Sequence, residues 1–117
     1  MESAVSDMKH CLAEVENTMG QLEEKYPAFW EAYWGFSQEA KKEGVLSKKI
    51  KELICIAIGI AIHCAFCIAI HTKKAIGAGA SRDEIMETAF VAAAMGGGPS
   101  VSYLRYVIDA LDQVGTD

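Results

Sequence analysis

The chain has 117 residues, of which 51% are hydrophobic, and its formal net charge is −5 at pH 7. This length suits one modest core, so we expect residues 1–117 to form a single domain. The absence of a basic stripe or an arginine cluster excludes nucleic acid as a partner. Because so small a domain has too little interior for this much apolar surface, the composition favours a homo-oligomer.

Two helices are expected in the first third of the chain. Apolar residues from Val5 to Leu22 recur at spacings of three and four, which predicts an amphipathic helix that ends near Lys25. Pro27 suits the first turn of a second helix, and Gly44 suits its end.

The second of these helices is rich in aromatic residues. Phe29, Trp30, Tyr33, Trp34 and Phe36 all lie within it. Such a cluster is typical of core and interface packing. The alternative interpretation is an aromatic wall over a pocket for an apolar substrate or a lipoyl-type arm.

The central segment is an uncharged run of eighteen residues, 53–70. Its alternating isoleucines are also typical of a strand, but a strand without a partner would leave its backbone unpaired. We therefore expect a helix from the cap Ser47 through Ile62, and a fourth helix from near Cys64 to the segment 77–79. The run is long enough to cross a membrane, but a histidine within it and lysines at both ends favour buried helices, with no membrane partner.

The last third of the chain completes an all-α bundle of about six helices. Ser81 and Glu84 form a capping box that starts a fifth helix, which extends to about Met95. A glycine-rich segment then breaks the chain, and a final helix is expected from the apolar residues between 101 and 111. The tail 114–117 is expected to be frayed.

The cellular compartment of the protein affects how its four cysteines are interpreted. The amino-terminal residues are acidic and lack the apolar core of a secretory signal, which predicts a cytoplasmic protein. In that compartment a CxxC pair is more often catalytic or metal-binding than structural. The other two cysteines, Cys11 and Cys55, are expected to act as small buried hydrophobic residues.

The segment from Cys64 to His71 carries the chemistry that the sequence predicts. On a helix, Cys64, Cys67 and His71 share one face, so His71 can help to generate a reactive thiolate. Cys67 has His71 as its i,i+4 partner, whereas Cys64 lies near the helix start, where free N–H groups stabilise a thiolate. Glu52 lies twelve residues before Cys64, and it can join them only if the chain bends at His63–Cys64.

This pattern resembles the AhpD-like alkylhydroperoxidase branch of the carboxymuconolactone decarboxylase family. The similarity covers about residues 24–111 and includes the segments 44–47, 51–54 and 71–81. It implies an all-α domain assembled as a trimer or hexamer. We expect no cofactor and no metal. The resemblance also implies a thiol-dependent peroxidase whose substrate is a hydroperoxide and whose reductant is an external dithiol of the thioredoxin or lipoyl type. The implied proton relay consists of Glu52, Cys64, Cys67 and His71, with Cys67 as the attacking thiol.

One position departs from the family pattern. Peroxidase relatives can carry a histidine where this chain has Phe66, whereas His63 here precedes the first cysteine. We therefore treat His63 as a candidate auxiliary residue.

Three other functions remain open. Cys64, Cys67 and His71, with Glu52 or His63, could hold a metal, although structural zinc usually draws its second ligand pair from a separate loop. The decarboxylase branch of the family typically lacks the CxxC pair. A helical oligomer that senses oxidant or exchanges disulfides without turnover is the third alternative.

Overall fold

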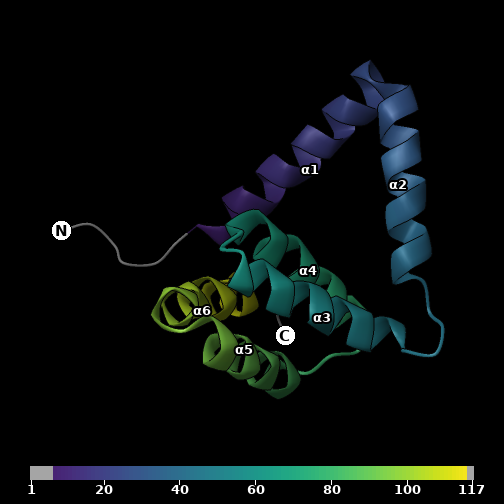
Figure 1. Ribbon diagram of the computed structural model, residues 1–117. Helices are drawn as coiled ribbons and strands as arrows, with labels where there is room; N and C mark the ends of the chain where they lie inside the picture. Colours follow the sequence, from purple (N-terminus) through teal and green to yellow (C-terminus); the bar gives the residue numbers. More distant parts are fainter. Residues whose placement is uncertain (1–6, 116–117) are drawn as a thin grey trace.

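The computed structural model describes residues 7–115, and this part contains six α-helices, one π-helical turn and no strand (Figure 1). The helices are α1 (Met8–Lys25), α2 (Pro27–Lys41), α3 (Lys48–Ala61), α4 (Ala65–Gly77), α5 (Arg82–Gly96) and α6 (Gly98–Ala110), and the π-helical turn is Leu111–Gly115. The predicted all-α architecture is confirmed. Of the stripe predicted for the first helix, Val5 lies outside the described residues.

The predicted caps position the central helices. The Ser47 side chain accepts a hydrogen bond from the N–H of Ile50 at 3.1 Å and thereby starts α3. Ser81 and Glu84 form the predicted capping box of α5. The break between α5 and α6 falls at Gly97, whose φ of 75° suits glycine.

The predicted end of the second helix is wrong, because α2 stops at Lys41 rather than at Gly44. Lysines of α3 bind the carbonyl groups that the helix end leaves free. Lys51 Nζ donates to the carbonyl oxygens of Ala40 and Lys42, at 3.0 and 2.6 Å. Lys48 Nζ donates to the carbonyl of Lys41 at 3.3 Å. These two lysines thus satisfy carbonyl groups at the helix end that a C-terminal glycine cap would otherwise satisfy.

The predicted fraying at the carboxyl end is wrong for Val114 and Gly115. Both belong to the π-helical turn, and Val114 packs against the core. The Gln113 side-chain oxygen also accepts a hydrogen bond from the N–H of Met8 at 2.7 Å. Residues 116 and 117 lie outside the described part of the chain.

The core lies among α3, α4, α5 and α6. Helix α3 packs on α4 and α5, and α6 packs on the same two helices. The fully buried side chains Ile56, Ile60, Ile68, Ile85 and Val107 come from these four elements. The uncharged run 53–70 is therefore a pair of packed helices joined by a turn. Within residues 7–115 the structure contains no helix long and apolar enough to cross a membrane.

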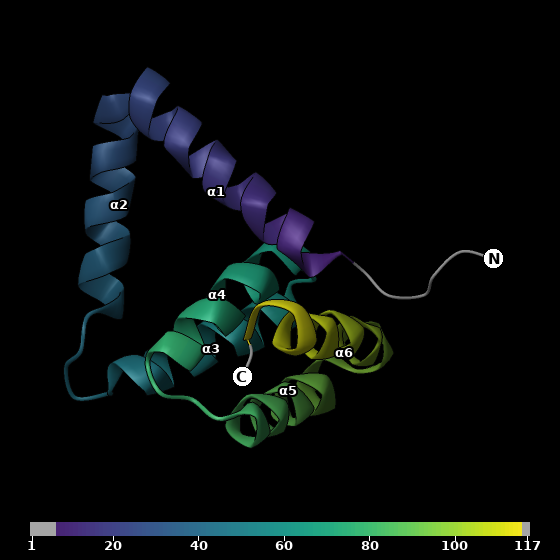
Figure 2. The same cartoon turned by 180° about the vertical axis from the view of Figure 1, so that it is seen from behind.

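Helices α1 and α2 form an arm that stands away from this core (Figures 1 and 2). Only Met8 and Leu12 of α1 and Ser37 of α2 are buried. The radius of gyration is 14.5 Å, whereas a compact chain of this length would have about 13 Å. Apolar side chains of the arm such as Phe29 and Phe36 are exposed. The predicted homo-oligomer and the single domain over 1–117 stay predictions.

Helices α3 and α4 approach each other closely at Gly59, which has no side chain. A Cβ atom at position 59 would lie 3.0 Å from the Cβ of Cys67. Gly59 thus sets the distance between the helix that carries Glu52 and the helix that carries the cysteine pair.

The substitution Gly59→Ala is expected to destabilise the protein by about 1 kcal/mol. Overpacking costs about 1–3 kcal/mol, and the better helix propensity of alanine returns about 1 kcal/mol. The measurement is the free energy of unfolding in urea. Gly20→Ala in α1 is the matched control, because no atom lies within 4 Å of its added Cβ. We expect this control to stabilise the protein by about 0.5–1 kcal/mol. If both substitutions changed the free energy of unfolding in the same direction, the close approach at Gly59 would be contradicted.

Candidate active site

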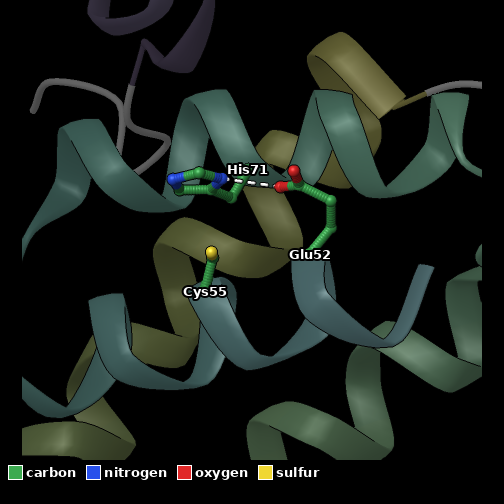
Figure 3. Close-up of side chains that lie close together, drawn as sticks. All are labelled: Glu52, Cys55 and His71. Atoms are coloured by element: carbon green, nitrogen blue, oxygen red, sulfur yellow. Dashed lines mark hydrogen bonds and ion pairs between the residues drawn. The ribbon is translucent and has the colours of Figure 1, made fainter. Parts of the chain in front are cut away.

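The turn between α3 and α4 brings Glu52 and His71 into contact. His63 takes the left-handed conformation in this turn, with φ of 61°, which is costly for a residue with a side chain. The N–H of Cys64 donates to the carbonyl of Gly59 at 2.8 Å and fixes the reversal. His71 Nδ1 then lies 2.7 Å from Glu52 Oε1 (Figure 3). The bend that the sequence analysis required is present.

The Glu52 carboxylate is fully buried, and its neighbours favour the ionised form. Burial alone would raise its pKa, but the hydrogen bond and the charge of His71, with the charges of Lys48 and Lys74, hold the pKa below 4.5. Its second oxygen, Oε2, lies 3.4 Å from Lys48 Nζ. This oxygen accepts no hydrogen bond from the described residues.

The His71 imidazole is a strengthened base. Burial alone would lower its pKa, but hydrogen bonds with Cys55 and Glu52 outweigh burial and raise the pKa above 6.5. Because Nδ1 faces Glu52, the other ring nitrogen, Nε2, lies on the opposite side of the ring (Figure 3). Glu52 thus orients the ring and stabilises its protonated form.

The Glu52–His71 pair predicts a defined pH dependence of stability. The lowered pKa of Glu52 gives stabilisation that is present above pH 4.5 and is lost as pH falls through the folded-state pKa. The raised pKa of His71 gives stabilisation that is present below pH 6.5 and is lost as pH rises through its folded-state pKa. The contribution of the pair to the free energy of unfolding is therefore largest between these two values.

The measurement is urea unfolding from acid to mildly alkaline pH, with the double variant Glu52→Gln/His71→Asn as the reference. Neither replacement titrates, so the difference between the two proteins isolates the pair. A difference that stays flat across this range would contradict the ion pair.

Cys64 and Cys67 are joined in a disulfide, with 5.3 Å between their Cα atoms, so the structure holds the oxidised form of the CxxC pair. Cys64 is the N-cap of α4, and its Sγ accepts a hydrogen bond from the N–H of Cys67 at 3.1 Å. Both side chains are half-buried. The predicted position of Cys64 at the helix start is confirmed.

Cys67 and His71 line one cavity of about 140 Å³ between the arm and α4. Helix α2 contributes Tyr33 and Trp34 to its wall, and Lys74 Nζ lies 5.3 Å from the centre of the Trp34 ring. Part of the predicted aromatic wall therefore lines the cavity that Cys67 and His71 also line. Other aromatic side chains of α2, such as Phe29 and Phe36, are exposed.

His63 lies apart from this cavity, whose described lining does not include it. Its side chain is exposed, and its ring centre lies 5.0 Å from that of Tyr103 in α6. The position predicted for His63, next to the first cysteine, is observed, but its ring points to a different element of the fold.

Sequence reasoning missed Cys55. Ligand atoms of Glu52, Cys55 and His71 all lie within 4.8 Å of one another (Figure 3). Cys11 and Cys55 were expected to be buried, but both are half-buried: Cys55 lies beside Glu52 and His71, and Cys11 packs against the core. The signal was in the sequence, because Cys55 follows Glu52 by three residues and so shares its helix face.

Comparisons with known proteins give one family model and several relatives. The sequence model of the Carboxymuconolactone decarboxylase family matches residues 27–110. An uncharacterized protein of Cupriavidus necator is 33% identical over 107 residues, which cover 92% of this chain and 95% of that protein. An uncharacterized protein of the cox locus of Paracoccus denitrificans is 32% identical over 84 residues, which cover 72% of this chain and 76% of that one.

A solved structure has the same fold along nearly the whole chain. The apo form of a carboxymuconolactone decarboxylase family protein from Legionella pneumophila matches with a TM-score of 0.88 and 30% identity, over 93% of this chain and 97% of that one. A family protein from Thermotoga maritima matches with a TM-score of 0.78 and 22% identity, over 87% of each chain, and supports the fold alone.

Proposed function

The chain belongs to the carboxymuconolactone decarboxylase family, and from this premise we propose that it is a thiol-dependent peroxidase of the AhpD-like branch. One observation carries the proposal: Cys67 and His71 line the same cavity, and the buried Glu52 holds His71 by a hydrogen bond of 2.7 Å. A thiol beside an oriented base that a carboxylate strengthens is the arrangement that a nucleophilic cysteine needs.

The first half of the proposed reaction oxidises Cys67. With the pair reduced, the Cys67 thiol gives its proton to His71, whose imidazolium form Glu52 stabilises. The thiolate attacks the distal oxygen of a hydroperoxide, and the O–O bond breaks. Cys67 becomes a sulfenic acid, and the alkoxide leaves as an alcohol after taking the proton from His71.

The second half closes and reopens the disulfide. The Cys64 sulfur attacks the sulfur of the Cys67 sulfenic acid, and the hydroxyl group leaves as water with the Cys64 proton. An external dithiol of the thioredoxin or lipoyl type then reduces the disulfide through a mixed disulfide and is itself oxidised. The cavity beside Cys67, with Tyr33 and Trp34 in its wall, suits an apolar hydroperoxide or the arm of such a reductant.

The test is a thiol count and an intact mass of the reduced protein before and after one equivalent of peroxide. We expect two thiols to disappear, the mass to fall by about 2 Da, and both changes to map to the peptide that carries Cys64 and Cys67. With excess dithiol, the enzyme consumes many equivalents of peroxide per chain. A single equivalent consumed under those conditions would instead identify a redox sensor, and an unchanged thiol count would remove the peroxidase proposal.

A further inference from the structure

The cluster of Glu52, Cys55 and His71 has a composition that the proposed peroxidase does not require. The reaction above uses the carboxylate and the imidazole, whereas the Cys55 sulfur takes no part in it. A thiol, an imidazole and a carboxylate are together the ligand types that bind zinc in proteins. The cluster therefore calls for a second chemical interpretation.

The spacing of the three side chains suits a tetrahedral ion. Their ligand atoms all lie within 4.8 Å of one another. With zinc bond lengths of about 2.0–2.3 Å, ligand atoms of a tetrahedral site lie about 3.3–3.6 Å apart. To reach such distances, side-chain rotations must lengthen the 2.7 Å contact between His71 Nδ1 and Glu52 Oε1 and bring the Cys55 sulfur closer. Glu52 and Cys55 share one helix and His71 comes from another, so α3 and α4 together define the site.

A second observation points to a cation at the same place. Glu52 is fully buried, yet its Oε2 atom accepts no hydrogen bond from the described residues, and its charged neighbour Lys48 stays at 3.4 Å. The positive charge of Lys48 compensates the charge of this carboxylate, but the lone pairs of a buried oxygen without a hydrogen-bond donor have lost their hydration. A bound divalent ion would satisfy this oxygen.

We propose that Glu52, Cys55 and His71 form a binding site for Zn²⁺, with a fourth coordination position left for water or a small anion. The Cys55 thiol releases its proton to solvent on binding, and the imidazole coordinates in its neutral form. This set differs from the metal site considered for the CxxC pair, because it uses neither Cys64 nor Cys67. Occupation would also withdraw Glu52 and His71 from the relay, and this consequence, unlike the binding, rests on the proposed function.

The test uses Co²⁺ as a spectroscopic substitute for Zn²⁺ in the oxidised Cys11→Ser protein. With the CxxC pair in its disulfide, Cys55 is then the one remaining thiol of the four cysteines. We expect a thiolate-to-cobalt charge-transfer band that saturates at one ion per chain and disappears when Zn²⁺ displaces the cobalt. The additional change Cys55→Ser should abolish the band and weaken Zn²⁺ binding more than about 100-fold.

Two further measurements keep the outcome decisive. Zn²⁺ should protect Cys55 from alkylation in the oxidised Cys11→Ser protein, which requires no change within the site. The variant Cys64→Ser/Cys67→Ser should keep the band. The proposed zinc site would be wrong if no charge-transfer band appeared or if the band persisted after Cys55→Ser. Loss of the band in the Cys64→Ser/Cys67→Ser variant would also contradict it. None of these readouts measures peroxide turnover, so they leave the peroxidase proposal to its own test.

Discussion

Replacing Cys67 by serine is expected to lower kcat/KM for peroxide by about 10⁴-fold or more, because removal of a catalytic nucleophile has effects of this size. A serine hydroxyl does not ionise near neutral pH, and His71 alone cannot make it a comparable nucleophile. Of the two cysteines of the pair, Cys67 is the one that lines the cavity with His71. The measurement is peroxide consumption with the external dithiol in excess.

The matched control for this prediction is Cys64→Ser. In that variant Cys67 is expected to react once, to remain as a sulfenic acid that a selective reagent can trap, and then to stop. Peptide mapping of the trapped product separates Cys67 from Cys11 and Cys55. If the sulfenic acid forms instead at Cys64 in the Cys67→Ser variant, the roles of the two cysteines are reversed and the assignment is wrong.

The helices were predictable because their signals are local. Ser47, Ser81 and Glu84 are caps that act on residues three positions away. The alternating isoleucines of α3 are typical of a strand, but they are also compatible with the helix that the structure contains. In a helix, Ile56 and Ile60 share one face and are buried, while Ile54 and Ile58 share another and are exposed. Alternation along the sequence is thus compatible with helical burial at i,i+4 spacing.

The ends of α2 and of the chain were mispredicted because the residues that hydrogen-bond to them lie elsewhere in the sequence and form no recognisable motif. The free carbonyl groups of α2 are bound by Lys48 and Lys51, which lie beyond the loop that follows it. The hydrogen bond between Gln113 and Met8 joins residues 105 positions apart. Patterns that describe one element at a time carry no information on such contacts.

The candidate site was predictable in its composition and only partly in its geometry. The sequence placed Cys64, Cys67 and His71 on one face, but it left open whether Glu52 would reach them. That contact depends on the turn at His63 and on the close approach at Gly59, which a sequence pattern does not encode. The spacing of Cys55 to Glu52 places both residues on one helix face. Only the structure shows that His71 lies beside both and completes a cluster of possible metal ligands.

The substitution Glu52→Gln is expected to lower kcat/KM about 100-fold at pH 7, the usual size of a contribution from acid–base catalysis. Glutamine can still accept the hydrogen bond from His71, but it cannot compensate a buried positive charge. Burial then lowers the pKa of His71, and the contact with Cys55 is left to oppose it without the carboxylate. The imidazole becomes a weaker base, so less of the Cys67 thiolate forms. Near pH 9 the thiol ionises without help, and the loss should be smaller.

Measurement of kcat/KM at both pH values therefore separates a chemical role of Glu52 from a structural one. Equal losses at pH 7 and near pH 9 would indicate damage to the fold and would contradict the relay. Glu39→Gln is the matched control, because Glu39 is exposed and its ion pair with Lys42 at 2.8 Å should leave activity within about twofold. Since Glu52 acts through His71, adding Glu52→Gln to a His71→Ala variant should cost little further activity, as expected for residues that act as a unit.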